Sequence, residues 1–134
     1  MSATSIPHPL RIFVIENHTD TLKYFKMYLE MEGHTVLDAQ TIQQAYETLP
    51  GAGCDVLISD VGLPDGTGWD LLTRLREEGL PHPPFAIAVS GYGSLEDRER
   101  SRVAGFRHHL LKPFDPDNLD ELLAEAAREF AMAR

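Results

Sequence analysis

Short apolar runs alternate with longer stretches of mixed polarity along most of this chain. Five runs are rich in Val, Ile, Leu or Phe and are bounded by turn residues, a pattern typical of strands buried on both faces of a sheet. They cover residues 11–15, 34–37, 55–60, 85–89 and 106–111. Strict alternation of such strands with helices predicts an α/β domain built on a parallel sheet with right-handed crossovers.

Four of the stretches between and after these runs carry apolar residues at helical spacing, which gives each expected helix one buried face. The expected inward positions are Leu22, Phe25 and Leu29; Ile42, Ala45 and Leu49; Trp69, Leu72 and Leu75; and Leu119, Leu122, Leu123, Ala126 and Phe130. A further helix, expected over residues 95–104, is mostly charged and should be largely solvated. Asp115 and Pro116 form a good N-cap and first-turn pair for the last helix. Glycine and proline predict a turn at residues 50–53 and a break at residues 81–84.

The size of the chain fits a single domain. With 134 residues and a hydrophobic share of 43%, it can bury a full core. Five strands and five helices in this order predict a flavodoxin-like (βα)5 fold, a doubly wound sheet with strand order 2-1-3-4-5. We expect the folded domain to span residues 10–131 and residues 1–9 to form a flexible N-terminal segment.

The net charge and the cysteine content narrow the possible partners and the cellular compartment of the protein. The formal net charge of −9 argues against direct binding of nucleic acid or of an anionic membrane through the domain surface. No run approaches membrane-spanning length, and residues 1–9 lack the basic and then apolar pattern of a signal peptide. The single cysteine, Cys54, cannot form an internal disulfide, which fits a reducing compartment. We therefore predict a soluble, cytoplasmic protein.

Polar residues stand at the ends of four expected strands. Glu16 and Asn17 follow the first strand, Asp60 ends the third, Ser90 follows the fourth and Lys112 follows the fifth. The carboxyl ends of neighbouring parallel strands share one edge of the sheet, and ligands of open α/β sheets bind there. The sequence thus predicts two carboxylates, an amide oxygen, a hydroxyl and an ammonium in one shallow cleft.

Each of these groups has a defined chemical use. Asp60 is placed as a nucleophile that can hold a phosphoryl group as an aspartyl-phosphate. Glu16, Asn17 and Asp60 offer oxygen ligands to Mg²⁺, which neutralises charge on phosphoryl oxygens. Ser90 can hydrogen-bond one of those oxygens, and Lys112 can pair first with Asp60 and then with the phosphate. Singly, each residue is common loop or cap chemistry, so the prediction depends on all of them meeting at one edge.

In these residues the chain resembles the receiver domain of response regulators in two-component signalling. The resemblance covers roughly residues 10–131 and is carried by Glu16-Asn17, residues 60–68, Ser90-Gly91 and Lys112-Pro113-Phe114. It implies that Asp60 accepts a phosphoryl group from a phosphohistidine, so the expected partners are a histidine kinase or a histidine phosphotransfer protein. It also implies that the backbone carbonyl of Gly62 joins the Mg²⁺ ligands. At most, the chain is expected to catalyse its own phosphorylation and dephosphorylation.

The resemblance assigns further roles around this site. It implies a cis peptide bond before Pro113, which X-Pro bonds tolerate best. It implies a switch made by Ser90 and His109, in which an imidazole stands where the family usually has an aromatic ring. A surface histidine without a switch role is the alternative for His109. Gly62 and Tyr92 are expected to flank the water that removes the phosphoryl group.

The first helix is expected to dock the phosphoryl donor, as it does in this family. Tyr24, Met27 and Met31 fall on its outer side, and exposed aromatic and methionine side chains favour a binding surface. Scattered surface apolar residues, which are normal, are the alternative. Because no DNA-binding or enzymatic domain follows residue 134, we expect the output to be binding of a downstream protein, onward phosphotransfer or assembly.

Asn17 departs from the family pattern, which usually has an acidic residue in contact with the metal at that position. An amide oxygen brings no charge, so we expect Mg²⁺ to bind roughly tenfold more weakly. The alternative function is a degenerate, phosphorylation-independent interaction module, and Asn17 is its best support. A phosphohydrolase would need a second acid where Gly62 stands, and a flavin module would need a Gly-rich loop after the first strand. Neither pattern is present.

Overall fold

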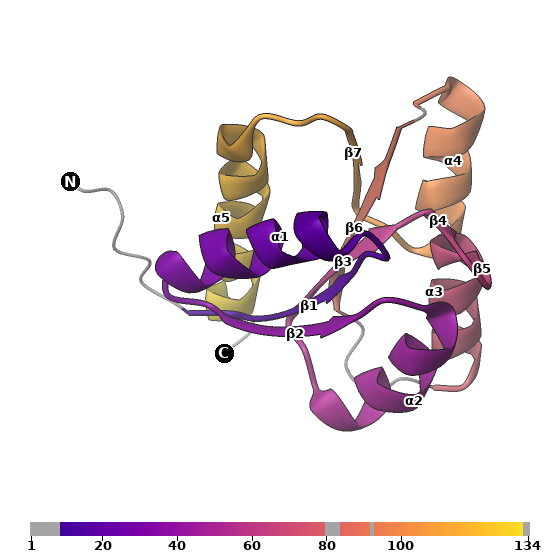
Figure 1. The fold of residues 1–134 in the computed structure, drawn as a ribbon, viewed down its shortest axis with the longest axis horizontal. Coiled ribbons are helices and arrows are strands. Elements are labelled where there is room, and N and C mark those ends of the chain that lie inside the picture. Colours follow the sequence, from indigo (N-terminus) through magenta and orange to yellow (C-terminus); the bar gives the residue numbers. More distant parts are fainter. Residues whose placement is uncertain (1–8, 80–83, 92, 133–134) are drawn as a thin grey trace.

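The computed structural model describes residues 9–79, 84–91 and 93–132, which form a parallel sheet between two layers of helices (Figure 1). In chain order the elements are β1 Arg11–Ile15, α1 Thr19–Met31, β2 Thr35–Ala39, α2 Ile42–Ala52, β3 Val56–Asp60, β4 Gly62–Leu63, β5 Gly66–Thr67, α3 Gly68–Glu77, β6 Phe85–Ser90, α4 Leu95–Ala104, β7 His108–Leu111 and α5 Pro116–Met132. Tyr92, nearly all of the segment 1–9 and most of the break at 81–84 lie outside the described residues.

The five longer strands form one sheet in the order β2-β1-β3-β6-β7, and every neighbouring pair is parallel. Counted among themselves, these strands have the predicted 2-1-3-4-5 order, so the predicted fold class is confirmed. Helices α1 and α5 cover one face of the sheet, and α2, α3 and α4 cover the other. Among the described residues, no helix combines the length and the apolar character that crossing a membrane would require.

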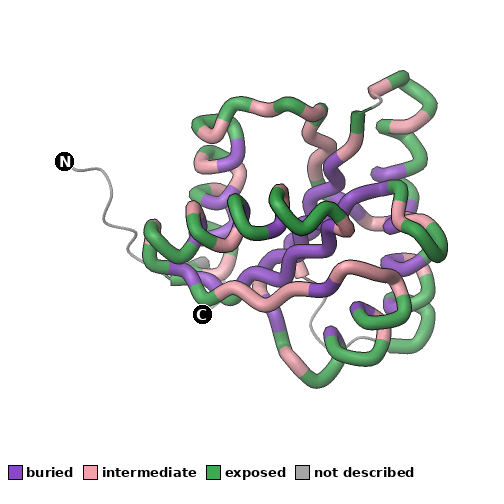
Figure 2. Tube along the Cα trace, in the orientation of Figure 1, coloured by how far each residue is buried: buried purple, intermediate pink, exposed green. Residues whose placement is uncertain are grey.

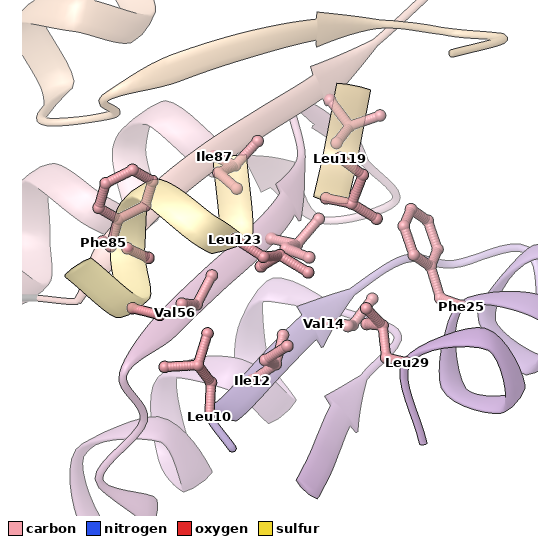
Figure 3. Close-up of a cluster of buried hydrophobic side chains, with 14 of the residues drawn as sticks. Leu10, Ile12, Val14, Phe25, Leu29, Val56, Phe85, Ile87, Leu119 and Leu123 are labelled. Atoms are coloured by element: carbon pink, nitrogen blue, oxygen red, sulfur yellow. The ribbon is translucent and has the colours of Figure 1, made fainter. Parts of the chain in front are cut away.

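Alternating side chains of the strands fill one core on each face of the sheet. In β1, Ile12 and Val14 belong to the core under α1 and α5, which Figure 3 shows, whereas Phe13 and Ile15 belong to the core on the opposite face. Figure 2 shows the buried residues concentrated along the central strands. Burying one such side chain stabilises the fold by about 1.5–3 kcal/mol, so the strands form a rigid platform.

The register of the strands brings four strand ends level with one another. Aligned across the sheet are Ile15 with Ser59, Asp60 with Val89, and Ser90 with Leu111. Glu16 directly follows the first of these strands and Lys112 directly follows the last. Glu16, Asp60, Ser90 and Lys112 therefore emerge at the same edge of the sheet, as the sequence predicts.

Four strands differ from their predicted ranges. β3 starts and β6 ends one residue later than expected. β2 lies later in the chain than the expected run because His34 turns inward, where its Nδ1 accepts a hydrogen bond from the Leu10 N–H at 3.0 Å. β7 begins later than expected because the N–H of Phe106 bonds back to the carbonyl of Ser101, at the end of α4. The hydrogen bonds made by these residues, rather than their apolar character, decide where each strand starts.

The turn predicted at residues 50–53 was wrong for most of that stretch, because α2 continues through Pro50 to Ala52. The N–H that proline lacks falls in the last turn of the helix, where its loss disturbs little of the hydrogen-bond ladder. Gly53, with a φ of 64°, ends the helix in the left-handed conformation. The turn after Asp60 also contains a small hairpin, β4-β5, which the sequence did not predict.

Four predicted inward positions are only partly buried. Ile42, Trp69, Leu122 and Phe130 pack against the margins of the two cores rather than inside them. Leu71, which the helical pattern did not include, is 1% exposed. In α3 the buried face therefore centres on Leu71, Leu72 and Leu75, and this rotation leaves Trp69 at the edge.

Candidate functional site

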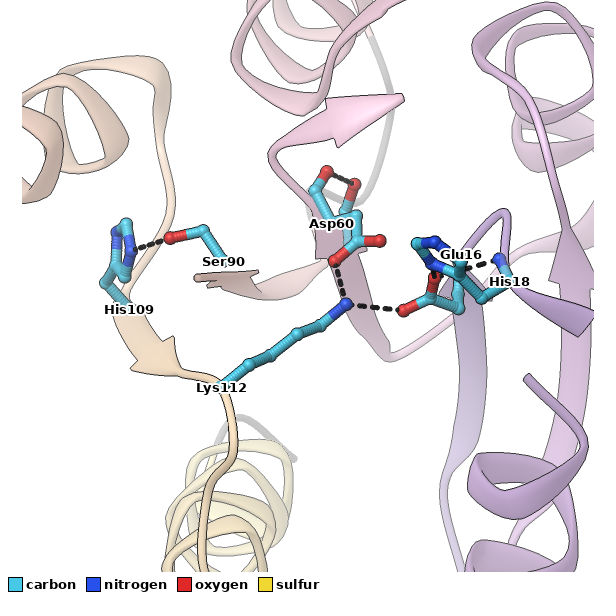
Figure 4. A network of polar contacts seen from close by, with 7 residues as sticks. Glu16, His18, Asp60, Ser90, His109 and Lys112 are labelled. Carbon is cyan, nitrogen blue, oxygen red and sulfur yellow. Dashed lines mark hydrogen bonds and ion pairs between the residues drawn. The ribbon is translucent and has the colours of Figure 1, made fainter. Parts of the chain in front are cut away.

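Lys112 joins two buried carboxylates at the edge of the sheet (Figure 4). Its Nζ lies 2.8 Å from Asp60 Oδ1 and 2.8 Å from Glu16 Oε1. Asp60, the last residue of β3, is 7% exposed, and Glu16, just after β1, is 1% exposed. Carboxylates in such surroundings repel one another unless a cation lies between them. Lys112 supplies that cation and brings together three of the predicted site residues.

His18 holds the second oxygen of the Glu16 carboxylate. The backbone N–H of His18 donates to Glu16 Oε2 at 3.0 Å, and the Nδ1 of its ring lies 2.9 Å from the same oxygen. His18 is the N-cap residue of α1, yet its side chain caps no amide of that helix. The imidazole is therefore part of the site. Sequence reasoning missed it, although its place two residues after Glu16 was the available signal.

The electrostatics of the three charged groups follow from burial and proximity. Burial, together with the nearby Glu16 carboxylate, raises the pKa of Asp60 to about 6, against the lowering effect of Lys112. Burial alone would also raise the pKa of Glu16, but hydrogen bonds from Lys112 and His18 outweigh it, so this pKa is lowered. Burial would lower the pKa of Lys112, but the two carboxylates raise it. Near neutral pH the three groups thus carry charges that bind one another.

Three side chains of the site present ligand atoms suited to a divalent cation. One carboxylate oxygen each from Glu16 and Asp60 and one ring nitrogen of His18 lie within 4.8 Å of one another. Such a set of oxygen and nitrogen donors fits a divalent metal ion. Asn17 is partly exposed between Glu16 and His18, and Gly62 is the first residue of β4. Their roles as metal ligands stay predictions.

Ser90 and His109 are in contact, and the contact continues beyond them. Ser90 Oγ lies 2.8 Å from His109 Nε2, and His109 Nδ1 lies 2.9 Å from Ser101 Oγ in α4. The ring N–H of Trp69 in α3 donates to the same Ser101 oxygen at 2.8 Å. A chain of polar contacts therefore links the end of β6 to α4 and α3. The sequence suggested the first pair but gave no sign of Ser101 or Trp69.

The loop that follows Asp60 is fixed at two points. The Asp65 carboxylate accepts hydrogen bonds from the backbone N–H groups of Ile42 and Gln43, at 2.8 and 3.0 Å, and these bonds lower its pKa. At Gly68 the backbone passes so close that a Cβ would lie 2.5 Å from the Asp60 carbonyl oxygen. The loop is thereby held against α2 and against the end of β3.

Two further predictions concern the peptide bond before Pro113 and the exposed side of α1. The Lys112–Pro113 peptide bond is cis, as predicted. Tyr24, Met27 and Met31 of α1 are 48%, 57% and 80% exposed, as the helical pattern predicted. Beside them runs a largely apolar groove of about 420 Å³ between α1 and the segment after β7, lined by Thr21, Tyr24, Phe25, Tyr28, Lys112, Pro113, Phe114, Pro116 and Leu119.

The doubly wound fold and the group of Asp60, Ser90 and Lys112 at its edge together define a receiver domain. Residues 12–124 match the response regulator receiver domain family, and the chain belongs to that family. It is 34% identical over 123 residues to an uncharacterized 14.6 kDa protein of Leptolyngbya boryana, covering 89% of this chain and 91% of that protein.

Other relatives place the same domain in longer and in equally short proteins. The chain is 31% identical to the transcriptional regulatory protein TrcR of Mycobacterium tuberculosis, covering 87% of this chain but 43% of that regulator. The crystal structure of a CheY-like receiver domain protein from Methanospirillum hungatei matches with a TM-score of 0.84 and 28% identity, covering 95% of this chain and all of that one. The chain therefore spans less than half of TrcR and nearly the whole of the Leptolyngbya protein.

Proposed function

We propose that this receiver domain accepts a phosphoryl group on Asp60 from the phosphohistidine of a histidine kinase or a histidine phosphotransfer protein. The observation that carries the proposal is the bridge of Lys112 between Asp60 and Glu16, at 2.8 Å to each. The bridge keeps a nucleophilic carboxylate and an ammonium together at the carboxyl end of the strands. That arrangement also favours the phosphoacceptor over the degenerate, phosphorylation-independent alternative.

The residues of the chain account for the transfer step by step. An oxygen of the Asp60 carboxylate attacks phosphorus, the bond from phosphorus to the donor nitrogen breaks, and the released imidazole takes up a proton. Lys112 then moves its ammonium from the carboxylates to a phosphoryl oxygen, and Ser90 donates its hydroxyl proton to another. A divalent cation, expected to be Mg²⁺, supplies neutralisation of phosphoryl charge when Glu16, Asp60 and their neighbours hold it.

The contacts of Ser90 suggest how the phosphoryl group changes the surface. Ser90 Oγ contacts His109 in the described structure, at 2.8 Å. When Ser90 turns to a phosphoryl oxygen, it leaves Nε2 of His109, and the bonds from His109 to Ser101 and from Ser101 to Trp69 rearrange. The rearrangement shifts the population of conformations of α4 and β7, which a downstream protein partner then recognises.

The exposed side of α1 is the proposed docking surface of the phosphoryl donor. Tyr24, Met27 and Met31 stand there, and Tyr24 also borders the apolar groove next to Lys112. A donor that binds over this surface and groove would present its phosphohistidine to the end of β3. Apolar and aromatic contacts of this kind commonly anchor protein interfaces.

Intact-protein mass after incubation with acetyl phosphate tests the proposal without a cognate kinase. We expect one phosphoryl adduct in the wild type that depends on a divalent cation, and no adduct in Asp60→Ala. Asp65→Ala is the matched control, because Asp65 lies in the same loop but binds α2. It should still gain the adduct. Absence of any adduct from the wild type over a wide range of Mg²⁺ concentrations would favour the phosphorylation-independent module instead.

A further inference from the structure

The imidazole of His18 lies inside the site without a task in the proposed reaction. Its Nδ1 lies 2.9 Å from Glu16 Oε2, while 70% of the side chain is exposed (Figure 4). At an N-cap position a polar side chain normally accepts a hydrogen bond from the helix, but that of His18 caps no amide. The ring is therefore aimed at the carboxylates, and its other nitrogen has room to face solvent.

The ligand atoms around His18 lie close to the spacing that a metal ion requires. Ligand atoms of Glu16, His18 and Asp60 lie within 4.8 Å of one another. Around an ion with bonds of about 2.0–2.2 Å, two ligand atoms are at most about 4.4 Å apart. Small side-chain movements are thus enough to place all three on one ion. Lys112, which bridges the two carboxylates, would give up at least one of these contacts as an ion enters.

Whether the ligand atoms are oxygen or nitrogen decides which ion the site prefers. Mg²⁺ selects oxygen ligands and water, whereas an imidazole nitrogen favours first-row transition ions such as Co²⁺, Ni²⁺ and Zn²⁺. The neutral amide of Asn17 stands where a second carboxylate would otherwise add charge that attracts Mg²⁺. The affinity of the site for a hard cation such as Mg²⁺ should therefore fall relative to its affinity for ions that bind nitrogen.

We propose that His18 is a direct ligand of the divalent ion at the phosphoacceptor and that it shifts the preference of this site from Mg²⁺ toward first-row transition ions. The inference rests on the proposed function, because it places the ion beside Asp60. On binding, Nδ1 gives its lone pair to the metal, and the proton it shares with Glu16 moves to Nε2 or to solvent. Glu16 and Asp60 supply the two oxygen ligands.

A simpler role for His18 predicts a different result. If the ring only orients Glu16 by donating a hydrogen bond to it, loss of the ring should lower the affinity for every divalent ion to a similar degree, because Glu16 is a ligand of each of them. If the ring is a metal ligand, its loss lowers the affinity for ions that prefer nitrogen and leaves the affinity for Mg²⁺ nearly unchanged. The ratio of two affinities therefore separates the two roles, even where a substitution perturbs the site.

Isothermal titration with Co²⁺ and with Mg²⁺ measures that ratio in the wild type and in His18→Gln. We expect His18→Gln to lose about tenfold or more in Co²⁺ affinity and less than about twofold in Mg²⁺ affinity. His108→Gln is the matched control, because His108 lies on the edge strand β7 and its ring contacts Glu125 of α5, so both affinities should stay unchanged. Asp60→Asn should weaken the binding of both ions, since it removes the negative charge of a ligand that they share.

A spectroscopic measurement checks the ligand directly. In long-range proton–nitrogen NMR spectra of the imidazoles, Zn²⁺ should shift the Nδ1 resonance of His18, whereas Mg²⁺ should not. Equal losses of Co²⁺ and Mg²⁺ affinity in His18→Gln, or no change in either, would overturn the inference, as would an unshifted Nδ1. The phosphoryl adduct on Asp60 is measured separately by mass. An adduct together with an unchanged affinity ratio therefore refutes the His18 ligand alone, and absence of the adduct refutes the proposed function.

Discussion

Lys112 and Asp60 face each other at 2.8 Å across the carboxyl edge of the sheet, and the same ammonium also reaches Glu16 at 2.8 Å. Asp60 is thus a nucleophile whose negative charge is tolerated only because a cation shares it. A phosphoryl group on Asp60 would compete for that cation directly. Acceptance of a phosphoryl group on Asp60 therefore depends on the contact between these two residues.

Asp60→Asn should change how stability depends on pH. The folded-state pKa of Asp60 is raised to about 6, so its contribution to stability is fully present below its ordinary pKa near 4 and is lost as pH rises through 6. Replacing it should stabilise the metal-free protein at pH 7.5 by about 1–3 kcal/mol. Urea unfolding of both proteins in EDTA, from pH 4.5 to 7.5, measures the difference. A difference that does not grow with pH would contradict the account.

Asn17→Asp should tighten the binding of Mg²⁺ by roughly tenfold, because a third carboxylate is added beside those of Glu16 and Asp60. Titration calorimetry measures the affinity. Gln40→Glu, which adds the same charge at a partly exposed position beyond β2, is the control and should change the affinity little. An unchanged Mg²⁺ affinity in Asn17→Asp would mean that residue 17 takes no part in the metal site.

Ser101→Ala should disconnect the switch without blocking phosphorylation. The chain contains one tryptophan, and the Trp69 ring N–H donates to Ser101 Oγ, so its fluorescence reports on the relay from Ser90 through His109. We expect acetyl phosphate to change the Trp69 emission in the wild type, and to change it by less than half as much in Ser101→Ala. Mass spectrometry should find the same phosphoryl adduct in both proteins.

His109→Ala tests the other member of the relay against the binding of a partner. Loss of the ring should make partner binding independent of phosphorylation, because the imidazole that connects Ser90 to Ser101 is gone. A partner that still distinguishes the phosphorylated from the unmodified variant, as well as it does for the wild type, would exclude the imidazole from the switch.

The double substitution Tyr24→Ala and Met31→Ala should slow phosphotransfer from a phosphohistidine protein but spare acetyl phosphate. Both side chains are exposed, at 48% and 80%, and neither contacts Asp60, so the chemistry should be intact. Leu95→Ala is the matched control, because Leu95 is an 86% exposed apolar residue on α4. Equal rates from the protein donor in all three proteins would place the donor on another surface.

Tyr28→Phe should destabilise the domain by about 1 kcal/mol. The Tyr28 hydroxyl donates to Asp120 Oδ2 at 2.8 Å and ties α1 to α5, and a typical hydrogen bond contributes about 0.5–1.5 kcal/mol. The control is Tyr24→Phe, whose ring stacks on Tyr28 from an exposed position. Urea unfolding should separate the two variants, and equal stabilities would remove the hydrogen bond from the account.

The sequence predicted those features that depend on position along a strand. Because strand ends in a parallel sheet share an edge, Asp60, Ser90 and Lys112 could be brought together without coordinates. The order of the strands followed from the alternation of elements. The boundaries were less predictable, because the apolar pattern contains neither the hydrogen bond from the Phe106 N–H to Ser101 nor the continuation of α2 through Pro50.

Contacts that depend on the direction in which a side chain points could not be predicted from positions along the strands. His18 belongs to the site only because α1 begins with its ring turned toward Glu16 instead of toward the helix amides. Ser101 and Trp69 lie on different helices, and they meet His109 only through the packing of α3 and α4 beside β7. Such contacts depend on tertiary packing, which residue spacing does not encode.

The most direct test of the central claim is the position of the phosphoryl group in the chain. Acyl phosphates are reduced by borohydride, which converts a phosphorylated aspartate into homoserine and marks its place for peptide mass mapping. After incubation with acetyl phosphate and a divalent cation, we expect homoserine at residue 60 and at no other aspartate. Homoserine elsewhere, or an adduct of the intact protein that leaves Asp60 unmodified, would contradict it.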